Sequence, residues 1–157
     1  MNTDTPPEGE PLVRDIMTTP VVSVPSSMSV RELAALFRDR RIGGVPVVDD
    51  DRLVGIVTEG DLMALDADVQ MPHFFELFDS IIYLGSQKKF KEQLEKASAA
   101  TVAQLMTDEV ETVAPDDEAR VAAKLMSRHK FDRVPVVEGE AVVGIVTRHD
   151  IMKILGL

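Results

Sequence analysis

Hydrophobic and polar positions along the chain predict a short series of elements that occurs twice. After a strand candidate at 21–24, residues 29–41 begin with a Ser-x-x-Glu capping box and continue with apolar residues at helical spacing. Two runs of β-branched residues follow, at 45–48 and 53–57, with three aspartates between them, and they predict an antiparallel hairpin. A further helix is expected to begin after Thr58. The predicted unit is therefore strand, helix, strand, strand, helix.

The second copy of this unit lies 89 positions further along the chain. Aligning 15–63 with 104–152 gives 18 identities in 49 positions without a gap, so we call these copy 1 and copy 2. The most similar stretches read VPVVDDDRLVGIVTEGD, from Val45, and VPVVEGEAVVGIVTRHD, from Val134. In copy 2, Asp116 is expected to cap the first long helix.

Two segments lie outside the copies. Residues 1–11 combine Pro, Glu, Thr and Gly, which predicts a flexible tail. Residues 67–100 hold four of the six phenylalanines and the only tyrosine, and their apolar spacing predicts a helical insert. We expect this insert to pack against the copies or against a second subunit. The predicted organisation is thus a tail, a unit at 12–66, the insert and a unit at 101–157.

Composition narrows the classes of function. The 157 residues include 27 acids and 17 bases, a formal net charge of −10, which disfavours binding to nucleic acid or to an anionic membrane. The absence of cysteine excludes disulfides, thiolate metal sites and cysteine nucleophiles, and the three histidines have no short metal-ligand spacing. No apolar run approaches the ~18 residues that cross a bilayer, and the first residues do not form a secretory signal. We therefore expect a soluble, cytoplasmic protein without a metal site.

The sequence Gly-Ile-Val-Thr-x-x-Asp, at 55–61 and 144–150, carries the candidate chemistry. Glycine inside a strand marks a bulge or the close approach of another group. The threonine and aspartate fall at a helix N-terminus, where free N–H groups favour anions. A carboxylate can accept both hydroxyls of a ribose, and a threonine can donate to a phosphate oxygen. Thr-x-x-Asp is also a helix-capping pattern, which would suffice to explain either copy alone. Its pairing with glycine in both copies favours a nucleotide site.

The motifs M-T, V-P-V-V and G-I-V-T-x-x-D, in tandem, resemble a pair of CBS domains (a Bateman module) over 12–66 and 101–157. The resemblance implies an α+β fold in which two pseudo-symmetric β-α-β-β-α units pack through their sheets. It also implies clefts between the units that bind AMP, ADP, ATP or S-adenosylmethionine, and a homodimer of such pairs. Because the chain contains no effector domain, a regulated protein is expected to act in trans.

The resemblance further implies two sets of contact residues. The aspartates would bind ribose, the motif threonines would bind ribose or phosphate, and the isoleucines would flank the adenine. The first cleft would be formed by Asp150 with Thr18, Val22, Ser23, Ile145 and Thr147. The second would be formed by Asp61 with Ile56, Thr58, Thr107, Glu111 and Thr112.

The two expected clefts differ in charge. Copy 2 has Arg133, Arg148 and His149 at the positions where copy 1 has glycine, glutamate and glycine. Because polyphosphate needs cations and arginine offers a fixed donor fork, the Asp150 cleft is expected to be the better nucleotide site. Mg²⁺ would arrive with the nucleotide. Glu111, in place of a common apolar residue, weakens the case for the Asp61 cleft. The other interpretation of the two arginines is a surface charge or an ion pair with one of the many acids.

Three functions follow for testing. The first is a non-catalytic regulatory module that binds an adenosine ligand and signals to a partner. The second is a dimerisation scaffold whose clefts stay empty. The third, an enzyme such as a nucleotide hydrolase, lacks a recognisable set of base, nucleophile and metal ligands in this sequence.

Overall fold

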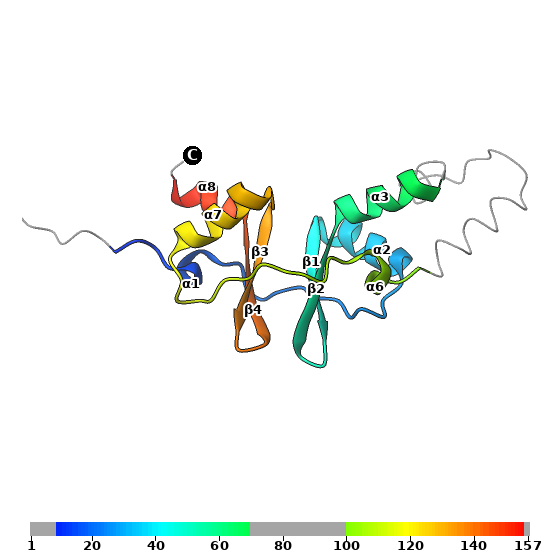
Figure 1. Ribbon diagram of the computed structural model, residues 1–157, viewed down its shortest axis with the longest axis horizontal. Helices are drawn as coiled ribbons and strands as arrows, with labels where there is room; N and C mark the ends of the chain where they lie inside the picture. Colours follow the sequence, from blue (N-terminus) through cyan, green and yellow to red (C-terminus); the bar gives the residue numbers. More distant parts are fainter. Residues whose placement is uncertain (1–8, 70–99, 156–157) are drawn as a thin grey trace, which may run out of the picture. The chain divides into compact units, whose positions relative to one another are not determined.

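The computed structural model describes residues 9–69 and 100–155, and it divides into two compact units (Figure 1). The central unit lies within Val22–Val110. The terminal unit combines Met1–Val21 with Glu111–Leu157. Most of the predicted tail (1–11) and of the predicted insert (67–100) lies outside the described residues.

The central unit contains the hairpin and both helices that copy 1 predicts. Its elements are α2 (Val30–Arg40), β1 (Gly44–Asp49), β2 (Arg52–Thr58), α3 (Glu59–Val69) and α6 (Val102–Leu105). Strands β1 and β2 pair antiparallel from Gly44 opposite Thr58 to Asp49 opposite Arg52, with a bulge-like shift after Val47. The predicted hairpin is therefore confirmed.

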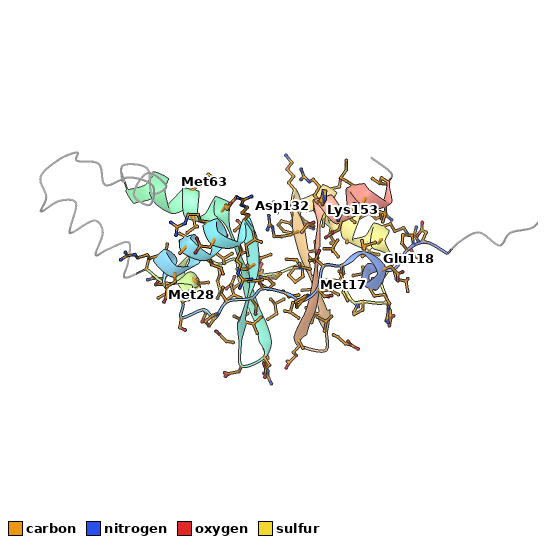
Figure 2. The ribbon with its side chains drawn as sticks, turned by 180° about the vertical axis from the view of Figure 1, so that it is seen from behind. Met17, Met28, Met63, Glu118, Asp132 and Lys153 are labelled. Atoms are coloured by element: carbon orange, nitrogen blue, oxygen red, sulfur yellow. The ribbon has the colours of Figure 1, made fainter. Side chains whose placement is uncertain are left out.

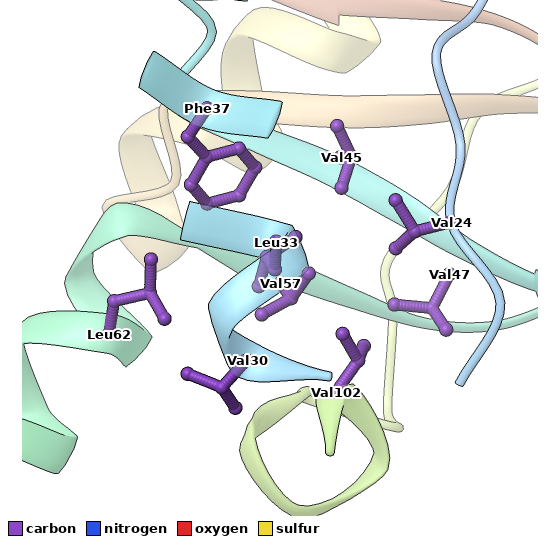
Figure 3. Close-up of a cluster of buried hydrophobic side chains, with 9 residues drawn as sticks. All are labelled: Val24, Val30, Leu33, Phe37, Val45, Val47, Val57, Leu62 and Val102. Atoms are coloured by element: carbon purple, nitrogen blue, oxygen red, sulfur yellow. The ribbon is translucent and has the colours of Figure 1, made fainter. Parts of the chain in front are cut away.

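Helix α2 begins with the predicted capping box. The Ser29 hydroxyl accepts from the Glu32 N–H at 3.1 Å, and the Glu32 carboxylate accepts from the Ser29 N–H at 3.1 Å. The apolar face of the helix then packs on the hairpin (Figure 3). The buried residues of this core are Val24, Val30, Leu33, Phe37, Val45, Val47, Val57, Leu62 and Val102.

The strand predicted at 21–24 is wrong. Only Val24 pairs, in a single parallel bridge beside β1, donating to Pro46 O at 3.1 Å and accepting from the Val48 N–H at 2.9 Å. The next donor of this parallel ladder would be the Ser26 N–H, which donates instead to Asp49 Oδ1 at 2.9 Å, so the ladder does not continue. In copy 2, Val113 forms the same isolated bridge with Val136.

The terminal unit repeats this arrangement with copy 2. Its elements are α1 (Val13–Ile16), α7 (Ala119–His129), β3 (Arg133–Glu138), β4 (Ala141–Thr147) and α8 (Arg148–Ile154). Strands β3 and β4 pair antiparallel with the same shift in register, here after Val136. Its core consists of Val13, Val113, Ala122, Met126, Val134, Val136, Val146 and Ile151.

The predicted cap of α7 by Asp116 is wrong. The N-cap residue is Glu118, and its side chain makes no capping bond. The helix begins at Ala119, two residues later than a cap at Asp116 requires, and the Ala119 N–H donates to the backbone carbonyl of Pro11 at 2.8 Å. Asp116 instead forms an ion pair with Arg14 of α1.

Each compact unit includes the opening segment of the other copy. Helix α1, which begins copy 1, contacts α7, α8 and β4, and its Val13 is fully buried in the terminal core. Helix α6, which begins copy 2, contacts α3, and its Val102 is fully buried in the central core. Burying one such valine contributes about 1.5–3 kcal/mol, so the exchanged segments are part of each core. This exchange positions the Met-Thr pairs described next.

Candidate functional site

The two strand glycines of the GIVT motifs lie under the exchanged Met-Thr pairs. A Cβ at Gly55 would lie 2.6 Å from Met106 Sδ and 2.9 Å from the Thr107 carbonyl oxygen. A Cβ at Gly144 would lie 3.0 Å from Met17 Cγ. The predicted close approach at these glycines is thus confirmed, and the approaching group belongs to the chain itself.

Backbone bonds fix each Met-Thr pair next to a GIVT motif. In the terminal unit Thr18 donates to Ile145 O at 2.8 Å and accepts from the Ile145 N–H at 3.2 Å. In the central unit Thr107 and Ile56 exchange the same two bonds, both at 2.9 Å. The N–H groups of both isoleucines are therefore already used. A contact between either isoleucine and an adenine would have to involve its half-buried side chain or its carbonyl group.

Asp150 is the centre of the polar cluster in the terminal unit, where its side chain is buried and only 7% of the residue is exposed. Its Oδ2 accepts from the N–H and the hydroxyl of Thr147, both at 2.9 Å, and the Asp150 N–H donates to Thr147 Oγ1 at 3.3 Å. Thr18 Oγ1 lies 3.4 Å from Oδ2 and 3.5 Å from Oδ1. Oδ2 is thus committed to the cap of α8, while Oδ1 has this one long contact and retains acceptor capacity.

Asp61 occupies the equivalent position in the central unit with fewer partners. Its Oδ2 accepts from the Thr58 N–H at 2.8 Å and from the Thr58 hydroxyl at 3.2 Å. Asp61 is half-buried rather than buried. Among the described residues, no side-chain hydrogen bond joins Asp61 to Thr107. The two aspartates therefore share a capping geometry but differ in burial and in their neighbours.

Several of the N–H groups that were expected to be free at these helix starts are already used. The N–H groups of Thr147 and Asp150 are used within the capping box, and that of Arg148 donates to Asp132 O at 2.8 Å. In the central unit the Glu59 N–H likewise donates to Gly43 O at 3.0 Å. The caps therefore use several of the donors that a phosphate could have met, while no bond from the His149 N–H is found among the described residues. An anion at the Asp150 motif would rely on side chains together with this remaining N–H group.

Arg133 forms an ion pair with the residue before it, Asp132, which lies at the start of β3 (Figure 2). Nε and Nη2 of Arg133 donate to the two carboxylate oxygens of Asp132 at 2.9 and 2.8 Å. The hydrogen bond from Arg133 is the main cause that lowers the pKa of the Asp132 carboxyl, and burial opposes it. The positive charges of Arg133 and, less strongly, of Arg148 also lower this pKa. The ion-pair interpretation therefore holds for Arg133.

Most predicted contacts of each motif lie in one unit. The terminal unit contains Thr18, Thr112, Arg133, Ile145, Thr147, Arg148, His149 and Asp150, of which Arg148 and His149 are exposed. The central unit contains Val22, Ser23, Ile56, Thr58, Asp61 and Thr107. The pairing of Val22 and Ser23 with Asp150, and that of Thr112 with Asp61, stay predictions.

Asp132 was not among the residues singled out from the sequence. The signal that could have identified it is the substitution of Gly43-Gly44 in copy 1 by Asp-Arg in copy 2, which introduces opposite charges together. Within the described ranges, 9–69 and 100–155, no group of three or more metal-ligating side chains is found, and no helix there is long and apolar enough to cross a membrane.

Comparison with known proteins identifies the family. The family model for the CBS domain matches residues 13–68 and again 102–157. The chain therefore belongs to the CBS-domain family, with two such domains in tandem, as its repeated motifs indicate.

Relatives and solved structures agree with this assignment. Uncharacterized protein MJ1426 of Methanocaldococcus jannaschii is 33% identical over 153 residues, covering 92% of this chain and 90% of that protein. This chain spans only 39% and 31% of two longer relatives from the same organism, MJ1232 and MJ1404.

Two solved structures show the fold with ligands. The CBS domain pair of protein MJ0100, in complex with 5′-methylthioadenosine and S-adenosyl-L-methionine, has 30% identity and a TM-score of 0.71, covering 94% of this chain and 97% of that one. CBSX2 in complex with AMP has 28% identity and a TM-score of 0.69, covering 92% and 95%. The predicted α+β class, with two small antiparallel sheets and their helices, is confirmed.

Proposed function

We propose that this chain is a non-catalytic regulatory module that binds an adenosine-containing ligand at its Thr-Asp motifs and signals to a partner protein. The observation that carries the proposal is the cluster of Thr18, Thr147 and Asp150, in which a buried carboxylate keeps acceptor capacity on Oδ1. The ligands of the MJ0100 domain pair and of CBSX2, which all contain adenosine, support this choice of ligand class.

In this proposal Asp150 accepts a ribose hydroxyl, and Thr18 or Thr147 contacts the ribose or the first phosphate. Val22 and Ser23 complete the site from the neighbouring stretch of chain. Asp61 and Thr58, with Thr107 and Thr112, form a second and weaker site. The ligand is AMP, ADP, ATP or S-adenosylmethionine, with any Mg²⁺ carried by the nucleotide. The protein acts as a homodimer in the cytoplasm. Binding of the ligand shifts the population of its conformations, and a partner protein recognises this change.

A scaffold without ligand is the second candidate, and one observation favours it. Both Thr-Asp motifs act as helix caps, a structural role that is complete without a ligand. In that case the motifs recur because two helices need the same cap.

Isothermal titration of the full chain with AMP, ADP, ATP and S-adenosylmethionine, with and without Mg²⁺, separates the two candidates. The informative variant is Asp150→Asn, because an amide oxygen can still accept from the Thr147 N–H while the charge is lost. We expect saturable binding to the wild type and a loss of about tenfold or more in Asp150→Asn, as for a charge-assisted hydrogen bond.

Asp61→Asn is the matched control, since it makes the same change in the other copy. An unchanged melting temperature of each variant without ligand shows that the cap survives. Absence of binding heat with every ligand would favour the scaffold. Catalytic release of product from ATP would contradict both candidates.

A further inference from the structure

The ion pair between Asp132 and Arg133 lies beside the Thr147-Asp150 cluster. Arg133 pairs in register with Thr147 across the β3–β4 ladder, and the Asp132 carbonyl accepts from the Arg148 N–H at 2.8 Å. The Arg133 side chain is only 15% exposed, whereas that of Asp132 is 55% exposed. The guanidinium is thus held against the protein, with a carboxylate on its outer side.

The Asp132 carboxylate uses Nε and one N–H of Nη2, which is one edge of the Arg133 guanidinium. Arginine binds carboxylate and phosphate through the same kind of planar N–H fork. A ligand phosphate at Arg133 therefore displaces Asp132 from that edge or shares the charge of the guanidinium with it. The net gain from such a phosphate is the difference between two similar interactions, which is much smaller than the gain at an unpaired arginine.

The other groups around the motif do not restore an attraction for polyphosphate. Asp132 and Asp150 carry negative charges that formally cancel those of Arg133 and Arg148. The N–H groups of Thr147, Arg148 and Asp150 already donate within the protein. The whole chain has a formal net charge of −10, so the long-range field also repels anions.

We propose that Asp132 competes with ligand phosphate for Arg133, so that the second and third phosphates of a ligand add little to the affinity of the Asp150 site for adenosine. This inference rests on the proposed function and specifies its ligand class. This competition can occur only at the Asp150 motif, because copy 1 has Gly43 and Gly44 at the positions of Asp132 and Arg133.

The test compares adenosine, AMP and ATP, without Mg²⁺ and at one ionic strength, by isothermal titration of the full chain and of Asp132→Asn. We expect wild-type affinities for adenosine and ATP within about threefold of each other. In Asp132→Asn we expect ATP to bind about tenfold more tightly, with adenosine unchanged. Asp132→Asn/Arg133→Met should lose that gain, because the freed guanidinium is its source.

Asp39→Asn is the matched control. Asp39 accepts from its neighbour Arg38 on α2 at 3.2 Å, so this variant makes the same change in net charge and breaks a similar adjacent pair in the central unit. The inference is overturned if wild type already binds ATP at least about tenfold more tightly than adenosine, or if Asp132→Asn behaves like Asp39→Asn. Either result leaves the proposed function standing. Absence of binding of adenosine, AMP and ATP by every variant overturns this inference, and the proposed function falls with it when S-adenosylmethionine does not bind either.

Discussion

The two Thr-Asp motifs share a capping geometry and differ in what surrounds it. In both, one aspartate oxygen accepts from the N–H and the hydroxyl of the threonine three residues earlier. Asp150 is buried and has a third partner in Thr18, while Asp61 is half-buried. Helix capping therefore explains the hydrogen bonds that the two motifs share. Any difference in ligand binding must come from the neighbouring residues.

The largest expected effect concerns the strand glycines, which carry the same motif but meet different atoms. At Gly55 an added Cβ would meet the Thr107 carbonyl, which is backbone, whereas at Gly144 its three nearest atoms all belong to the flexible Met17 side chain. We expect Gly55→Ala to lower the free energy of unfolding by about 2–3 kcal/mol and Gly144→Ala by about 1 kcal/mol. Urea denaturation of each variant measures this difference.

Amide hydrogen exchange shows which unit each substitution destabilises. Gly55→Ala should reduce amide protection in the central unit, and Gly144→Ala should reduce it in the terminal unit. Equal destabilisation by both substitutions would contradict the account in which Gly55 faces a backbone carbonyl and Gly144 faces a flexible side chain.

A smaller effect is expected from removing the caps. Asp150→Ala and Asp61→Ala each remove a side-chain acceptor at a helix start, which costs about 1 kcal/mol. We expect the larger loss for Asp150, because its burial leaves the Thr147 donors without a water substitute. Amide exchange in the first turns of α8 and α3 measures the two losses separately. A larger effect at Asp61 would mean that burial does not set the strength of the cap.

The smallest effect concerns a pair that only the central unit has. The Ser26 hydroxyl donates to Asp49 Oδ2 at 2.5 Å, and the Ser26 N–H donates to Oδ1 at 2.9 Å. Both bonds lower the pKa of the Asp49 carboxyl from its ordinary 3.8, and the bond from the hydroxyl has the larger effect. Since the folded pKa lies below the unfolded one, the stabilisation is complete above pH 3.8 and is lost as the pH falls through the folded value.

Carboxyl NMR titration should therefore find the pKa of Asp49 below 3.8 in the wild type and nearer to it in Ser26→Ala. Copy 2 has Pro115 and Glu138 at these positions, so the pair of Ser26 and Asp49 has no sequence equivalent there. An identical Asp49 titration in both proteins would show that Ser26 is not the cause.

Local pattern was enough to predict most of the fold. The hairpins follow from β-branched runs, and the cap of α2 follows from Ser29 and Glu32. The strand predicted at 21–24 is reduced to one bridge, because the Ser26 N–H that would extend the ladder donates to the Asp49 side chain. The cap predicted at Asp116 is wrong because the helix begins only at Ala119, whose N–H donates to Pro11, a residue from the far end of the chain. Local sequence does not show such long-range backbone partners.

The candidate site was predictable as a set of residues but not as a set of bonds. The repeated motif identified Thr147 and Asp150, and the resemblance to CBS domains placed Thr18 beside them. The capping alternative implied that the N–H groups of Thr147 and Asp150 are used inside the cap, whereas the bond from the Arg148 N–H to Asp132 O was not foreseen. The partner of Arg133 is its own neighbour, and only the side-chain geometry shows that it takes both oxygens of Asp132.

The most direct test of the difference between the motifs is a titration of the isotope-labelled protein with AMP, followed by amide NMR. The account predicts that the amides of Thr18, Thr147 and Asp150 shift and saturate at lower AMP concentrations than those of Thr58, Asp61 and Thr107. Saturation of the central-unit amides first, or no shift at either motif, would contradict it.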